Sequence, residues 1–178
     1  MPSDPLGRLP TTGDKGLVRR GRFTLDRNGD PESITIDVQH PSRALTTFHE
    51  IGHFLDLAGI GAPRGWESLV GDGALAEWRE LVLDSRAVGY LANQSHEDDL
   101  LIAEIALGAL EWPELWARSY VQYVVNRAGD LDLVAQLDVH RVPRTGGIYL
   151  PLQWDDDDFV VIDQVIEEVF RRLGWRSK

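Results

Sequence analysis

Residues 46–56 read TTFHEIGHFLD, and this stretch decides how the whole chain is interpreted. It contains the pattern H-E-x-x-H, with His49 and His53 four residues apart. On a helix, residues four apart lie one turn above each other, so both imidazoles can bind a single Zn²⁺ ion. Glu50 lies beside the metal without binding it, where it can deprotonate zinc-bound water. We therefore expect a helix over residues 42–58 that carries a catalytic zinc site.

A catalytic zinc site needs a third protein ligand, and this chain offers several candidates. The metzincin continuation, a third histidine soon after a glycine, is absent because FLDLAG follows His53. We expect instead a carboxylate from another helix. Glu114 stands out, because it begins a helix in which the small Ala117, one turn on, would allow close approach to the metal helix. Glu104 is the alternative ligand, and Glu114 could also be only a favourable acid in a first helical turn.

Two motifs carry a resemblance to a known family. The segment HEIGHFLD, followed by ELWARSY at residues 114–120, resembles the gluzincin-type peptidases of phages and mobile elements, which are related to the catalytic domain of anthrax lethal factor. The resemblance implies a zincin-like fold, peptidase activity and Glu114 as the third zinc ligand. It extends to a Tyr/Pro stretch at residues 149–151 and a closing amphipathic helix at 159–173. The chain departs from the family at Arg118, where members have an acid four residues after the ligand glutamate.

Further residues are candidates for supporting roles. Asp56 shares the helix face of His49 and His53, so it could accept a hydrogen bond from a ligand imidazole, or it could be a plain surface residue. Peptide hydrolysis also needs a donor that stabilises the oxyanion. The candidates are Tyr149, which we take as the catalytic choice, and Arg118, His140 and Tyr90. Helical phase directs Tyr120 and Tyr123 away from Glu114, so both are expected in the core.

The composition limits the class of protein. The chain has 178 residues, of which 43 % are hydrophobic, which is enough for one domain with a real core. A net charge of −11 would repel a phosphate backbone, so nucleic acid is not an expected partner. No apolar run is long enough to cross a membrane, and residues 1–22 lack the apolar stretch of a secretory signal. The absence of cysteine fits a reducing, cytoplasmic compartment and argues against a structural zinc site.

The hydrophobic pattern predicts a mostly helical α+β domain over residues 19–178, preceded by a flexible segment at 1–18. Two strands, 20–25 and 33–38, flank the turn-forming pair Asn28-Gly29. The loop at 139–154 contains Pro and Gly, with a possible strand near 148–150. Besides 42–58, helices are expected at 74–91, 97–110, 113–128, 131–137 and 159–173.

Three functions are compatible with these residues. The first is a zinc metalloendopeptidase that acts on a peptide or protein. The second is a catalytically degenerate zinc-binding relative from a phage or mobile element, and the third is a zinc hydrolase with a non-protein substrate. An intact Glu50 favours the first over the second. A free strand edge for an extended substrate, for example at residues 33–38, would favour the first over the third.

Overall fold

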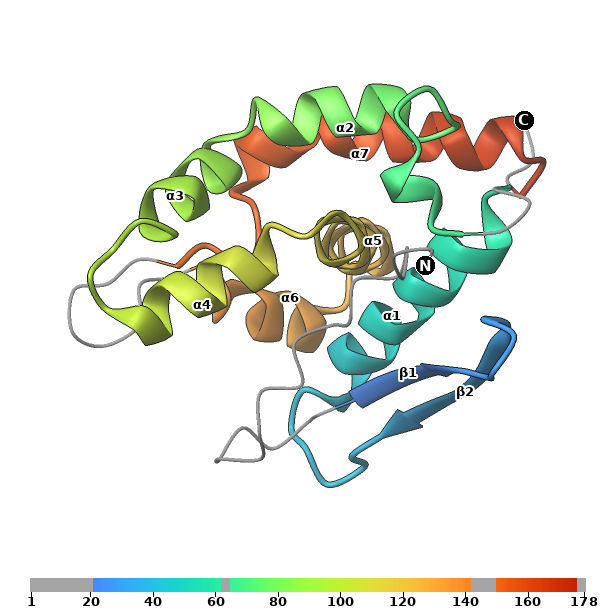
Figure 1. The fold of residues 1–178 in the computed structure, drawn as a ribbon, viewed down its shortest axis with the longest axis horizontal. Helices are drawn as coiled ribbons and strands as arrows, with labels where there is room; N and C mark the ends of the chain where they lie inside the picture. The colour runs from blue at the N-terminus through green and yellow to red at the C-terminus, as the bar shows by residue number, and fades with distance from the viewer. Residues whose placement is uncertain (1–20, 62–64, 142–149, 176–178) are drawn as a thin grey trace, which may run out of the picture.

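The computed structural model describes residues 21–61, 65–141 and 150–175, and Figure 1 shows their arrangement. This part of the chain is mostly helical and has one two-stranded antiparallel sheet, which confirms the predicted α+β class. None of its helices is long and apolar enough to cross a membrane. The predicted N-terminal segment 1–18, Tyr149 and most of the possible strand near 148–150 lie outside the described residues.

The sheet is the predicted hairpin, formed by β1 (Gly21–Leu25) and β2 (Pro31–Ile36). Its turn is stabilised by the carboxylate of Asp26, whose Oδ1 accepts hydrogen bonds from the backbone N–H groups of Asn28 and Asp30 at 2.8 and 2.9 Å. Gly29 takes a positive φ of 85°, which glycine adopts without strain. The hairpin packs against the helix that carries the H-E-x-x-H pattern (Figure 1).

That helix, α1 (Arg43–Phe54), continues directly into the π-helical turn η1 (Leu55–Gly59). In η1 the N–H of Ile60 bonds to the carbonyl of Leu55 at 2.9 Å, the wider spacing that defines this turn. A short 3₁₀ turn, η2 (Glu67–Leu69), follows. The predicted helix over residues 42–58 is thus present, but its last turn is widened immediately after His53.

The long helix α5 (Trp112–Ala128) lies at the centre of the fold, seen end-on in Figure 1. It begins with Pro113 in its first turn and ends at Gly129, whose φ of 61° is left-handed. Around it lie α1, α4 (Leu100–Ala109), α6 (Leu131–Asp138) and α7 (Asp156–Arg172). Because neighbours cover all its sides, nine of its residues are buried: Leu115, Trp116, Ala117, Arg118, Ser119, Val121, Gln122, Tyr123 and Val125.

The main core lies between α5, α7 and α2 (Ala76–Leu83). Its centre is aromatic: the ring of Trp116 lies edge-on to Trp78 at 5.3 Å and to Phe170 at 6.3 Å. Tyr123 is buried in this core and Tyr120 packs against it, which confirms the prediction that both point away from Glu114.

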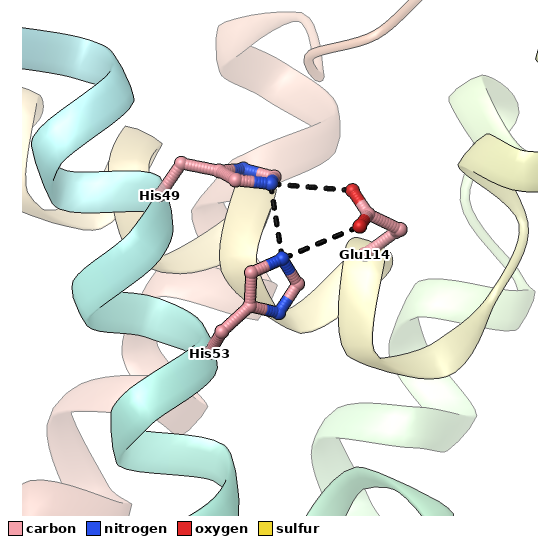
Figure 2. Close-up of side chains that lie close together, drawn as sticks. All are labelled: His49, His53 and Glu114. Carbon is pink, nitrogen blue, oxygen red and sulfur yellow. Dashed lines mark hydrogen bonds and ion pairs between the residues drawn. The ribbon is translucent and has the colours of Figure 1, made fainter. Parts of the chain in front are cut away.

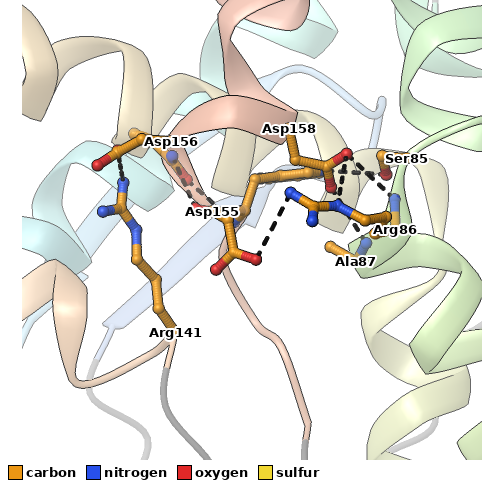
Figure 3. A network of polar contacts seen from close by, with 9 residues as sticks. Ser85, Arg86, Ala87, Arg141, Asp155, Asp156 and Asp158 are labelled. Carbon is orange, nitrogen blue, oxygen red and sulfur yellow. Dashed lines mark hydrogen bonds and ion pairs between the residues drawn. The ribbon is translucent and has the colours of Figure 1, made fainter.

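The predicted helix 74–91 is wrong in one respect, because the chain breaks it into α2 and α3 (Arg86–Gln94). Ser85 caps α3 by accepting a hydrogen bond from the N–H of Val88. Asp158, which is distant in sequence, accepts from the N–H groups of Arg86 and Ala87 at 3.2 Å each (Figure 3). The start of α7 therefore fixes the start of α3, through a tertiary contact that sequence periodicity does not reveal.

Helices α1 and α5 approach each other closely at Gly52. A Cβ atom on Gly52 would lie only 2.8 Å from the Cα of Ala117. The indole N–H of Trp116 donates to the carbonyl of Gly52 at 3.0 Å, which links the same two helices. Ala117 therefore faces α1, as the sequence predicted. This contact sets the distance between the histidines of α1 and the first turn of α5.

We expect Gly52→Ala to separate these helices. The added methyl group meets backbone, which cannot rotate away, so unfolding free energy should fall by about 1–3 kcal/mol. Gly89→Ala is the matched control: Gly89 lies in α3 with nothing within 4 Å of an added Cβ, so the change should stabilise by up to ~1 kcal/mol. Denaturant unfolding of both variants measures the difference. Equal effects of the two changes would contradict the close approach.

Candidate metal centre

Three side chains from two helices converge beside this contact. His49 and His53 lie one turn apart on α1, and Glu114 comes from the first turn of α5 (Figure 2). The Nε2 atoms of His49 and His53 are 3.1 Å apart. One oxygen of Glu114 lies 3.2 Å from Nε2 of His49, and the other lies 3.3 Å from Nε2 of His53. The residues form a group that could hold a metal ion.

The spacing of these atoms fits a small tetrahedral cation. Ligand atoms about 2.0–2.2 Å from zinc lie roughly 3.3–3.5 Å from one another in a tetrahedral site. The two Nε2 atoms are 3.1 Å apart, and each lies 3.2 or 3.3 Å from its nearer Glu114 oxygen, a different oxygen for each imidazole; all three separations are close to this range. Two imidazoles and one carboxylate form a ligand set typical of catalytic zinc, which leaves the fourth position for water or substrate.

The charges of the three groups support one another. Burial alone would raise the pKa of Glu114, but the charges and hydrogen bonds of His49 and His53 outweigh it and hold that pKa well below its usual range. Burial would likewise lower the pKa of His53, but its hydrogen bond to Glu114 and the charge of that carboxylate raise it instead. Because a metal needs the neutral imidazole, binding at this site should release protons.

Glu50 lies beside this group without joining it. The side chain is almost fully buried, with 7 % exposed, between α1 and β1. A Cβ atom on Gly21 of β1 would lie 2.8 Å from its Oε1, so glycine makes room for the carboxylate. Burial raises the pKa of Glu50, although the nearby His49 and His53 oppose this. A carboxyl with a raised pKa close to a metal site is suited to accept and release a proton.

The alternative third ligands lie elsewhere. Glu104 is exposed on α4, and His140 lies just after α6. Neither belongs to the group of potential ligands found among the described residues. Asp56 is not bonded to His53 as the sequence suggested. Both its oxygens accept hydrogen bonds from Ser68, while Nδ1 of His53 is buried and has no hydrogen-bond partner in the described part of the chain.

Arg118 has a structural role in the fold and does not stand in for a carboxylate. Its guanidinium donates to the backbone carbonyls of Glu114 at 3.3 Å, of Leu152 at 3.1 Å, and of Ala109. Burial lowers its pKa to about 10, so it stays charged at neutral pH. Through these hydrogen bonds, Arg118 fixes the first turn of α5. Of the other oxyanion candidates, Tyr90 is exposed on α3 and Tyr149 lies outside the described residues.

Sequence reasoning missed three residues near the site. Gly21 adjoins Glu50, Ser68 binds Asp56, and Trp66 packs edge-on against the imidazole of His53. These residues lie far from the H-E-x-x-H pattern in the sequence, and no periodic spacing connects them to it. The only local signal is the run of glycines around residues 59–73, which marks the segment as a loop.

No protein-family model matches this chain, and comparisons with curated proteins and with solved structures find no significant match.

The pH dependence of stability tests the environment of Asp56. Burial raises its pKa from 3.8 to about 6, although the hydrogen bonds from Ser68 oppose this. Between these values the folded protein keeps a proton that the unfolded chain has released, so the free energy of unfolding falls as pH rises. The side chain in Asp56→Asn does not titrate, so this decrease in the free energy of unfolding is absent. From pH 4 to pH 7, the stability of the metal-free variant relative to wild type should therefore rise by about 2 kcal/mol. Denaturant unfolding across this range measures it, and a constant difference would contradict the shift.

Proposed function

We propose that this protein is a zinc-dependent metallopeptidase of the gluzincin type with a zincin-like fold. The observation that carries the proposal is the convergence of His49, His53 and Glu114, with Glu50 buried beside them. The spacing of the three ligand atoms supports zinc as the metal. The two motifs that resemble gluzincin-type peptidases support the same conclusion.

Each residue has a definite role in this proposal. His49 and His53 bind the metal through Nε2, and Glu114 binds it through its carboxylate. Zinc, when bound, polarises the scissile carbonyl and makes water more acidic. Glu50 accepts the proton from the attacking water and passes it to the leaving amine. A buried carboxyl with a raised pKa is suited to both steps, because it accepts a proton more readily than a solvent-exposed carboxylate does.

The hairpin favours a peptide as substrate. Among the described residues, β1 has β2 as its only strand partner, so one edge of β1 has no strand beside it. Gly21 of this strand adjoins Glu50. An extended peptide could therefore bind along β1 by backbone hydrogen bonds and present an amide bond near the metal. The strand beside Glu50 is β1 and not the 33–38 segment considered from the sequence.

Two other functions remain as competitors. A catalytically degenerate relative would keep the metal ligands without need for a proton acceptor, whereas here Glu50 is intact and buried beside them. A zinc hydrolase with a non-protein substrate would need no strand edge next to the site. Cleavage of peptides, with and without Glu50, separates the peptidase from the other two.

Metal analysis tests the ligand set. The wild type should bind about one equivalent of zinc, because three ligands suffice for a catalytic site. His49→Ala, His53→Ala and Glu114→Ala should each lose it, since two remaining ligands bind the ion weakly. Glu104→Ala is the control, because it removes an exposed glutamate from a helix outside the site and should leave zinc content unchanged. Full zinc content in Glu114→Ala would remove Glu114 from the ligand set.

The role of Glu50 is tested by Glu50→Gln, which keeps the size of the side chain but cannot accept a proton. This variant should retain its zinc, because Glu50 is not a ligand, while peptide hydrolysis should fall by about 10²–10⁴-fold. The assay needs a peptide that the wild type cleaves, found by screening a peptide library with mass spectrometry. Equal rates in the two proteins would exclude Glu50 as the base.

A further inference from the structure

The orientation of the His53 ring needs an explanation. A histidine that binds a metal usually donates its other ring N–H to a carboxylate, carbonyl or water, which fixes the ring. In His53 this nitrogen, Nδ1, is buried, and none of the described residues is its hydrogen-bond partner. Nε2 bonds to Glu114, so the contacts made by the rest of the ring are needed to fix its orientation.

The group that contacts the ring is Trp66. Its indole lies edge-on to the imidazole of His53, with ring centroids 5.7 Å apart and planes at 83°. On its other side, Trp66 contacts Phe23 of β1 at 6.2 Å and 80°. Phe23 in turn packs edge-on against Phe54, the residue after His53, at 6.4 Å. The imidazole is therefore held by aromatic packing, a geometry that aromatic rings favour.

Trp66 is itself held in place through Ser68, two residues further on. The N–H and the hydroxyl of Ser68 each donate to one oxygen of Asp56, both at 2.6 Å. Asp56 and Ser68 are completely buried. The carbonyl of Ser68 also accepts a hydrogen bond from Arg79 of α2. A buried carboxylate with both oxygens bonded to one residue fixes that residue firmly.

Asp56 lies in η1, three residues after His53. The contacts therefore run from His53 to Trp66, through Ser68 to Asp56, and back along the chain to His53. We propose that Asp56 is a positioning residue for the metal centre. Through Ser68 it places Trp66 against His53, and Trp66 fixes the imidazole with Nε2 toward the metal. Asp56, Ser68 and Trp66 together are named the aromatic clamp. This inference rests on the proposed metal site and adds to it residues that do not touch the metal.

The experiment compares variants of the clamp with a matched control, using the full chain. Trp66→Leu removes the ring that contacts His53. Ser68→Ala removes one of the two bonds to Asp56. Asp56→Asn is the conservative variant, because its amide oxygen can accept from the Ser68 N–H while its NH₂ group donates to the hydroxyl. Ser85→Ala is the control: Ser85 is also buried, accepts a hydrogen bond from the indole N–H of Trp154 at 3.0 Å and is not part of the clamp.

Two readouts separate positioning from stability. One is the zinc dissociation constant, measured by competition with a chelator at a temperature where every variant is folded. The other is the visible spectrum of the Co²⁺-loaded protein, which reports ligand geometry. Trp66→Leu should weaken zinc binding by about 10–100-fold and change the Co²⁺ spectrum, as loss of an outer contact does at other sites. Ser68→Ala should shift both in the same direction by less. Asp56→Asn and Ser85→Ala should bind zinc within about threefold of wild type, although Ser85→Ala lowers the unfolding midpoint.

Several results would overturn the clamp. Wild-type zinc affinity and Co²⁺ spectrum in folded Trp66→Leu would do so, as would a loss in Asp56→Asn equal to that in Trp66→Leu. If Trp66→Leu does not fold, an unchanged affinity and spectrum in Ser68→Ala decides against the proposal. A wild type that binds zinc but cleaves no peptide would refute the peptidase and leave the clamp intact. A wild type that binds neither zinc nor Co²⁺ would refute both.

Discussion

The close contact of α1 with α5 at Gly52 is the constraint on which the rest of the site depends. Any side chain at this position would meet the backbone of Ala117, so the two helices could not stay at this distance. At this distance the carboxylate of Glu114 reaches both imidazoles at once. The bond from Trp116 to the carbonyl of Gly52 holds the same contact from the core side. The helix that carries His49 and His53 and the helix that carries Glu114 are thus one packed unit.

This geometry places two glutamates close enough to influence each other's charge but in different environments. Glu114 lies between two imidazoles, which hold its pKa well below the usual range and keep it anionic. Glu50 is buried between α1 and β1, and burial raises its pKa. The roles proposed for them, binding a cation and exchanging a proton, need such opposite shifts. The difference in pKa follows from packing, because both residues have the same side chain.

Local patterns in the sequence predicted what local interactions determine. The hairpin at Asn28-Gly29, the helix through His49 and His53, and a helix that begins near Glu114 all follow from turn residues, spacing and Pro113. The break between α2 and α3 did not, since Asp158 of α7 stabilises it. Nor did spacing predict that the helix face with His49 and His53 is buried. Asp56 on that face is completely buried, and Gly52 lets α5 approach the same helix closely.

The two halves of the site are held by different means. On the α5 side, Arg118 donates to three backbone carbonyls. These acceptors do not depend on which side chains the residues that supply them carry. On the α1 side, His53 relies on the ring of Trp66, which a side-chain contact between Asp56 and Ser68 keeps in place. Position 118 thus holds a buried cation, and the buried carboxylate on the α1 side is Asp56 of η1. A buried cation without a carboxylate partner is costly unless its donors are satisfied. Its three carbonyl acceptors explain how Arg118 is tolerated beside a centre of this kind.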